Sequence, residues 1–139
     1  MKELRVIIAG SRDFNDFSKL TSSTNSILNE IISRIDDVDK IRIISGTARG
    51  ADRLGERFAK NNGYELSRFP ADWAFFGKRA GYIRNHKMAN FAIQDGNYGV
   101  LIAFWDGKSK GTKHMINMLI GTGLDVHVVK YKEEDYENV

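Results

Sequence analysis

Short apolar runs alternate along the chain with segments whose apolar residues recur every three or four positions. The runs are rich in β-branched residues and predict strands at 4–9, 41–45, 64–69, 98–104 and 126–129. The segments between them have helical spacing, as at Ile27, Leu28, Ile31 and Ile35. They predict a helix at about 20–35 and further helices that begin near residues 51, 80 and 111.

This alternation of strands and helices is typical of βαβ units and predicts a single α/β domain over residues 1–139. The strands are almost continuously apolar, as expected when helices cover both faces of a parallel sheet. Right-handed crossovers then favour five mainly parallel strands in the order 3-2-1-4-5, half of a doubly wound fold. We expect a ligand crevice where the winding reverses, at the carboxyl ends of the first and fourth strands.

The composition narrows the class of protein without naming its activity. Hydrophobic residues make up 42% of the chain and charged residues 28%, as in ordinary globular proteins. No apolar run approaches the roughly 18 residues that span a bilayer, and no signal-peptide core follows the N-terminus. The chain has no cysteine, which excludes disulfides and thiolate metal sites. We therefore expect a cytoplasmic protein with no membrane partner.

The charge and the longer loops add little more. The net charge of +3 permits nucleic acid as a partner but does not require it, because like charges form no long block. The histidines show no metal-ligand spacing, so we expect neither a metal nor a cofactor. The acidic tail at 132–137 should be solvated, and the stretch at 70–80 is the longest irregular segment, of a length typical of functional loops.

Glycine-containing loops follow the first, second and fourth predicted strands. Glycine lets backbone amides approach an anion, and the helix N-terminus that follows each loop favours negative charge. Such loops converge on one edge of a parallel sheet and point to a phosphate-bearing ligand. The candidate ligands in the first two loops are Gly10, Ser11, Arg12, Gly46, Thr47, Arg49, Gly50, Ala51 and Asp52.

Two interpretations of Asp52 stay open, because it falls in the first turn of a predicted helix. It can complement the helix dipole there, or it can accept hydrogen bonds from ribose hydroxyls or fix Arg49. The second loop is neither a Walker loop nor a dinucleotide-binding fingerprint, since its glycine spacing differs from both.

Two further segments supply candidate ligands. Arg84 and Asn85 lie in the first turns of the helix that begins near residue 80, where arginine suits phosphate and asparagine suits base or ribose edges. Asp106 follows the fourth strand, and Gly111 and Thr112 are expected to offer free amides and a hydroxyl at the next helix N-terminus. Trp105 either stacks on a base or belongs to the core.

Taken together, these motifs resemble the YspA, or DUF2493, branch of the SLOG superfamily. The resemblance rests on the segments 10–14, 45–52, 72–73, 77–81, 84–88 and 111–112, and it covers residues 6 to about 129. The superfamily also contains the Lonely Guy phosphoribohydrolases and the DNA-processing DprA proteins. The resemblance implies a Rossmann-like fold and a site for a nucleotide or a nucleotide derivative, and little about a reaction.

One departure bears on catalysis. Lonely Guy enzymes carry a glutamate shortly after their Gly-Thr pair, and the stretch after Gly111 and Thr112 here has none. Cleavage of an N-glycosidic bond requires a carboxylate, for which Asp106 and Asp52 are the main candidates and Asp72 a third.

The sequence therefore favours a binder of a nucleotide-derived ligand, acting as sensor, carrier or sequestering protein. The first alternative is a nucleoside-monophosphate N-glycosidase that uses Asp106 or Asp52. The second is a single-stranded DNA binder like DprA, which is weaker because the basic residues are scattered. The sequence leaves open whether the chain forms a homodimer.

Overall fold

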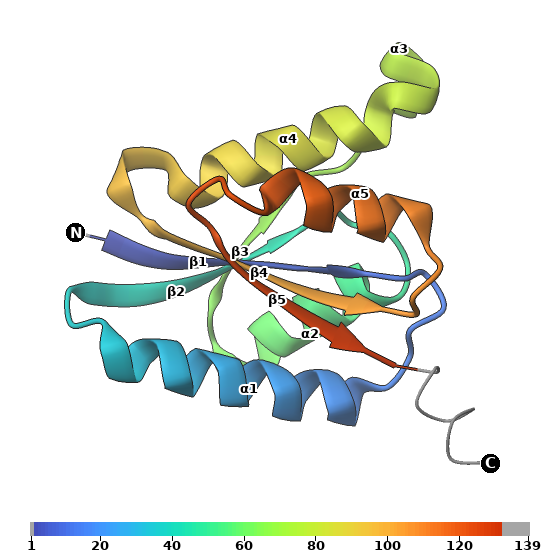
Figure 1. Cartoon of the computed structure of the whole chain (residues 1–139). Helices are drawn as coiled ribbons and strands as arrows, with labels where there is room; N and C mark the ends of the chain where they lie inside the picture. The colour runs from blue at the N-terminus through green and yellow to red at the C-terminus, as the bar shows by residue number, and fades with distance from the viewer. Residues whose placement is uncertain (1, 132–139) are drawn as a thin grey trace.

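A sheet of five parallel strands in the order β3-β2-β1-β4-β5 forms the centre of the computed structural model, which describes residues 2–131. This confirms the predicted strand order, and every neighbouring pair is parallel (Figure 1). The strands are β1 Lys2–Gly10, β2 Val38–Ser45, β3 Glu65–Arg68, β4 Tyr98–Trp105 and β5 Asp125–Lys130.

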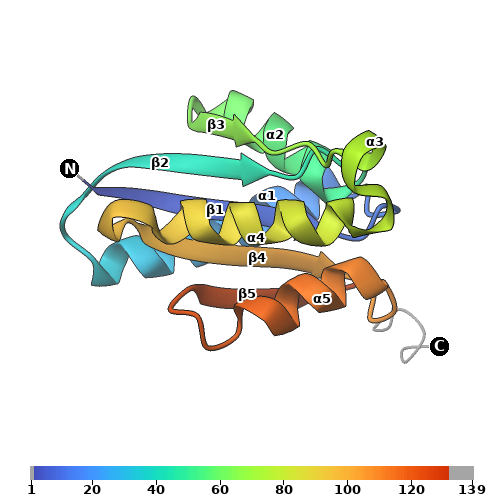
Figure 2. The same ribbon diagram turned by 90° about the horizontal axis from the view of Figure 1, so that it is seen from above.

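Helices cover both faces of the sheet, as predicted. Two long helices lie on one face, α1 Phe17–Arg34 and α2 Ala51–Asn62. The other face is covered by α4 Ala80–Ile93 and α5 Lys110–Leu119, which run side by side (Figures 1 and 2). Shorter helical turns complete the described chain: α3 Trp73–Phe76, η1 Gly77–Arg79 and η2 Gln94–Gly96. No helix of the described part is long and apolar enough to cross a membrane.

The central strand β1 contributes to two separate hydrophobic cores. Val6 and Ile8 pack with residues of α1 and α2, whereas Ile7 and Ala9 pack with residues of α4 and α5. Successive side chains of a strand point to opposite faces, so a strand covered on both sides must be apolar at every position. This double burial is the reason that residues 6–9 of β1 and 100–104 of β4 appear in the sequence as uninterrupted apolar runs.

The winding of the chain reverses between β1 and β4. From β1 the chain proceeds to β2 and β3 through α1 and α2, and from β4 it proceeds to β5 through α5 on the other face. The two strands pair in register up to Gly10 and Phe104, so both end at the same edge of the sheet. Loops that leave this edge toward opposite faces open a crevice between them.

Two predicted segments differ from the structure. Helix α1 begins at Phe17 rather than near residue 20, because the Asp16 carboxylate accepts a hydrogen bond from the Lys19 amide at 2.9 Å. The stretch at 70–80, predicted to be irregular, contains α3 and η1, and Asp72 caps α3 by accepting from the Phe75 amide at 3.1 Å. The acidic tail at 132–137 lies outside the described residues.

Gly10 allows the end of β1 to lie against both β4 and α2. A Cβ atom at this position would lie 2.9 Å from the Ala51 Cβ and 3.0 Å from the Phe104 carbonyl carbon. No side chain fits there without moving backbone. In contrast, a Cβ atom at Gly111 in α5 would meet nothing within 4 Å.

Gly10→Ala should therefore lower the free energy of unfolding by about 1 to 3 kcal/mol, the usual cost of overpacking. Gly111→Ala is the matched control and should be neutral or stabilising by up to about 1 kcal/mol, since alanine favours a helix over glycine. Urea unfolding of the two variants measures the difference. Equal stability of Gly10→Ala and the wild type would contradict the packing argument.

Candidate functional site

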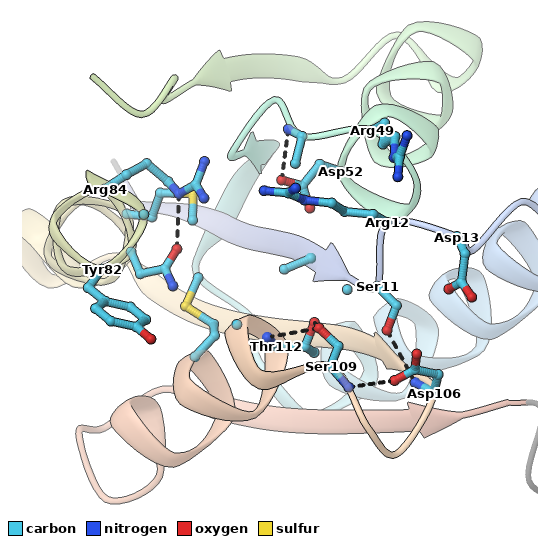
Figure 3. A pocket seen from close by; sticks show the side chains of 18 of the residues that line it. Ser11, Arg12, Asp13, Arg49, Asp52, Tyr82, Arg84, Asp106, Ser109 and Thr112 are labelled. Atoms are coloured by element: carbon cyan, nitrogen blue, oxygen red, sulfur yellow. Dashed lines mark hydrogen bonds between the residues drawn. The ribbon is translucent and has the colours of Figure 1, made fainter. Parts of the chain in front are cut away.

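A cavity of about 510 Å³ opens at the carboxyl ends of β1 and β4, within the size range of small-molecule sites (Figure 3). Most of the predicted ligand residues line it. From the loops after β1 and β2 and the start of α2 come Gly10, Ser11, Arg12, Arg49 and Asp52. From α4, the loop after β4 and the start of α5 come Arg84, Asn85, Asp106, Gly111 and Thr112.

Four other predicted residues, Gly46, Thr47, Gly50 and Ala51, do not line this cavity and instead shape the loop after β2. Gly50 has a φ of +85°, and a Cβ atom there would lie 2.6 Å from the Arg12 carbonyl oxygen. Ala51 is fully buried. These positions bring the second loop against the first, which places Asp52 at the cavity.

The sequence analysis did not select several lining residues as ligands. Trp73, Lys78 and Tyr82 reach the cavity from α3, η1 and the start of α4, and Ser109 precedes α5. The capping position of Ser109, just before a helix, was a signal that could have indicated it. Tyr82 lies two residues before Arg84. Sequence spacing alone does not place it at the cavity, because that position depends on how α4 packs against α5.

Ser11 joins the three loops around the cavity. Its amide donates to the Phe104 carbonyl at 3.0 Å, and its carbonyl accepts from the Ala51 amide at 3.4 Å. Its hydroxyl accepts from the Asp106 amide at 3.2 Å. With only 2% of its surface exposed, Ser11 therefore holds together the ends of β1 and β4 and the beginning of α2.

Arg84 is held at the cavity by two neutral acceptors. Its Nη1 donates to the Gly46 carbonyl, and its Nε donates to the Asn85 Oδ1 at 3.0 Å. Burial lowers the pKa of Arg84, the Asp52 charge opposes this shift, and the Arg12 charge adds to it. Within residues 2–131, neither Arg84 nor Arg12 nor Arg49 forms a salt bridge. These three arginines form one wall of the cavity, and this wall therefore carries positive charge without a directly paired anion.

Asp52 is the buried carboxylate of the cavity, with 6% of its surface exposed. Burial raises the pKa of Asp52 to about 6, against the hydrogen bond from the Ala48 amide and the charges of Arg84 and Arg12. The Ala48 amide donates to Oδ2 at 3.2 Å. The predicted contact of Asp52 with Arg49 is not among the hydrogen bonds or salt bridges of the described residues, and its neighbouring cations are Arg84 and Arg12 (Figure 3).

Asp106 has a different environment from Asp52. Its Oδ1 accepts from the amides of Lys108 at 2.9 Å and Ser109 at 2.8 Å. Partial burial alone would raise the pKa of Asp106, but the bonds from these two amides and from Ser11 outweigh it and lower the pKa. Asp106 is therefore an ionised carboxylate that shapes the loop after β4, and it is a poorer proton carrier than Asp52.

The start of α5 is less open than predicted. The Ser109 hydroxyl caps the helix by accepting from the Thr112 amide at 3.5 Å, and it also lies 3.1 Å from the Thr112 hydroxyl. The Thr112 amide is therefore not free, which corrects the expectation from the sequence. The Trp105 indole donates to the Ser109 carbonyl at 3.1 Å and packs against the core, so of its two interpretations the structure favours the second.

We also searched the described residues for a group of side chains that could bind a metal ion. Nowhere in residues 2–131 do three or more His, Cys, Asp or Glu side chains gather in a way that could hold a metal ion.

The contrast between the two carboxylates gives a pH-dependent prediction. The folded-state pKa of Asp52, about 6, lies above the value of 3.8 expected without the fold, so its ionised form opposes folding. Asp52→Asn should raise the free energy of unfolding near neutral pH by up to about 3 kcal/mol. The gain should shrink as pH falls through about 6 to 4, where the folded wild type takes up its proton.

Asp106→Asn is the matched control, with the opposite sign. Folding lowers the pKa of Asp106, so its ionised carboxylate adds to the free energy of unfolding at pH values above the pKa of the unfolded state. This added stability is lost as pH falls through the pKa of the folded state. This variant should be less stable than the wild type near neutral pH. Urea unfolding from neutral pH down to about pH 4 measures the stability of both variants. An Asp52→Asn variant less stable than the wild type at neutral pH would contradict the raised pKa of Asp52.

Comparison with known proteins agrees with this geometry. Residues 4–76 match the family described as "YspA, cpYpsA-related SLOG family". The chain is 32% identical over 129 residues to the "Gene 61 protein" of Mycobacterium phage D29, an alignment that covers 88% of this chain and 93% of that protein. No solved structure matches the sequence. The chain belongs to the YspA, cpYpsA-related SLOG family.

Proposed function

We propose that the protein binds a nucleotide or a nucleotide-derived ligand in the cavity at the ends of β1 and β4, as a sensor, carrier or sequestering protein. One observation carries the proposal: Arg12, Arg49 and Arg84 line this cavity, and none has a salt bridge among the described residues. Arginine matches the geometry of phosphate and keeps its charge under all ordinary conditions. A phosphate group would supply the anion that the wall lacks.

The opposite wall also suits a phosphate group. Gly111 lies in the first turn of α5, lines the cavity and leaves open space where a side chain would stand. The partial positive charge of a helix N-terminus adds to that of the arginines across the cavity. A phosphate group between the two walls would contact both.

The remainder of the cavity suits a base and a sugar. Trp73 and Tyr82 line it with 52% and 47% of their surfaces exposed, and their rings offer stacking faces. Asn85 is nearly buried, and its Oδ1 already accepts from Arg84. The Asn85 amide group is therefore oriented to donate to an acceptor on the base or the ribose.

Ligand binding should appear as stabilisation in a thermal-shift screen of nucleoside phosphates and dinucleotides. A ligand at about a hundred times its dissociation constant adds roughly 2.7 kcal/mol to the free energy of unfolding. Arg12→Ala should weaken binding by about 1.5 to 3 kcal/mol, the range for a hydrogen bond to a charged group. Arg79→Ala is the control, because Arg79 is exposed and does not line the cavity.

The absence of a shift with every nucleotide would overturn the proposed function. Single-stranded DNA belongs in the same screen, as the probe of the DprA-like alternative. A DNA complex whose affinity falls steeply with salt would favour that alternative instead.

A nucleoside-monophosphate N-glycosidase is the second candidate function. The buried Asp52, whose pKa is raised to about 6, favours it because such a carboxyl can hold or release a proton near neutral pH. The missing glutamate after Thr112 speaks against it. We expect nucleoside monophosphates to remain intact during long incubation with the wild type, as followed by chromatography of the free base.

Release of free base over many turnovers would reverse this expectation and would assign the enzyme class. Asp52→Asn should then slow release by a factor on the order of a hundred or more, as expected for a general acid or base. Asp106→Asn should have the smaller effect, because the carboxylate of Asp106 is occupied by loop amides.

A further inference from the structure

The carboxylate of Asp52 lies among the groups proposed to bind an anion, where a negative charge is unexpected. A Cβ atom on Gly46 would lie 2.8 Å from the Asp52 Oδ2 and 2.8 Å from the Arg84 Nη1, so the two side chains converge over this glycine. Arg12 extends along the same part of the cavity (Figure 3). An anion bound by Arg12 and Arg84 would therefore lie beside Asp52.

One oxygen of this carboxylate has no partner among the described residues. The Ala48 amide donates to Oδ2, and no hydrogen bond of the described chain reaches Oδ1. Asp52 is more than nine-tenths buried and lines the cavity, so a group bound in the cavity can reach this oxygen. An ionised carboxylate and a phosphate oxygen at hydrogen-bond distance repel each other unless one proton lies between them.

We propose that the site selects a terminal phosphate monoester, which shares one proton with Asp52, over anions whose oxygens are too weakly basic to share one. The inference rests on the proposed function and names its ligand class. A phosphate monoester has a second pKa of about 6, so its oxygens are basic enough to share a proton with a carboxylate of similar pKa. The oxygens of sulfate, of phosphodiesters and of the internal pyrophosphate of a dinucleotide are far weaker bases.

The proton balance of this complex is simple. Either the P–O–H of the monoester donates to the Asp52 carboxylate, or the protonated Asp52 donates to the doubly charged phosphate. Both descriptions contain one proton and the same net charge, and no covalent bond to a heavy atom changes. Near pH 7.5 both groups are mainly ionised, so the complex takes up this proton from solvent, and a weakly basic anion such as sulfate holds it less strongly.

The charged neighbours of Asp52 come from three elements. Arg84 on α4 and Arg12 in the loop after β1 favour the ionised carboxylate, as does the Ala48 amide in the loop after β2. Burial and Glu56, which lies one turn further along α2, favour the protonated form, and the resulting pKa of about 6 matches that of a phosphate monoester. The two groups are therefore suited to share a proton.

The test uses four small probes, each titrated into the full chain labelled with ¹⁵N: inorganic phosphate, methyl phosphate, sulfate and dimethyl phosphate. The Ala48 amide reports binding, because it contacts Asp52 directly. Near pH 7.5, phosphate and methyl phosphate should bind at least about tenfold more tightly than the other two probes. Near pH 5, where Asp52 gains its proton, sulfate should bind more tightly and the preference should shrink.

Asp52→Asn should abolish both the preference and its pH dependence, because asparagine can donate to sulfate and phosphate alike. Glu56→Gln is the matched control: it removes a carboxylate from the same helix, but Glu56 bonds Ser45 and Arg68 outside the cavity. This variant should keep the preference for phosphate.

Equal affinity of the wild type for phosphate and sulfate near pH 7.5 would overturn the inference and leave the anion site in place. Failure of all four probes to bind would overturn it as well. The proposed function is decided separately by the nucleotide screen, so nucleotide binding without the preference for a monoester would reject this inference alone.

Discussion

Ser11 is the point on which the geometry of the cavity depends. A parallel sheet ends in loops that leave toward opposite faces, and something must hold those loops together where the winding reverses. The backbone and hydroxyl of Ser11 bond to Phe104, Ala51 and Asp106, which belong to the end of β4, the start of α2 and the loop after β4. Glycine at position 10 makes this approach sterically feasible. The same contacts that close the fold therefore set the distance between the two walls of the site.

The cavity is electrostatically unbalanced, and this connects the fold to the proposed activity. Arg84 is oriented by a carbonyl and an amide oxygen, which accept hydrogen bonds without neutralising its charge. Burial opposes the charge of Asp52, which could otherwise balance it. A protein that kept these groups for stability alone would gain more from apolar residues of similar volume. The arrangement is better explained as one prepared for an anionic ligand.

Much of the fold followed from local sequence patterns, because periodicity reports directly on burial. Runs such as 6–9 and 100–104 are apolar at each position since helices cover both faces, and together with the preference for right-handed crossovers this predicted a parallel sheet and its order. The beginning of α1 was misplaced because a single capping residue, Asp16, decides where a helix starts. The turns within 70–80 were missed because they are short and none of their residues is buried before Ala80.

The sequence likewise indicated part of the site, and the tertiary structure decided the rest. Residue types and loop positions were sufficient to indicate which segments converge, since the ends of parallel strands must meet at one edge, and Arg12, Arg84 and Asp52 all lie at the cavity. Their roles depended on tertiary contacts between segments far apart in the chain. Asp52 and Asp106 are the same residue type after similar loops, yet burial raises the pKa of one and amide hydrogen bonds lower that of the other. The sequence determined which groups meet, and only the packing of α2 and α4 against the strand ends decided in which direction the pKa of each carboxylate is shifted, because burial is a property of the assembled fold.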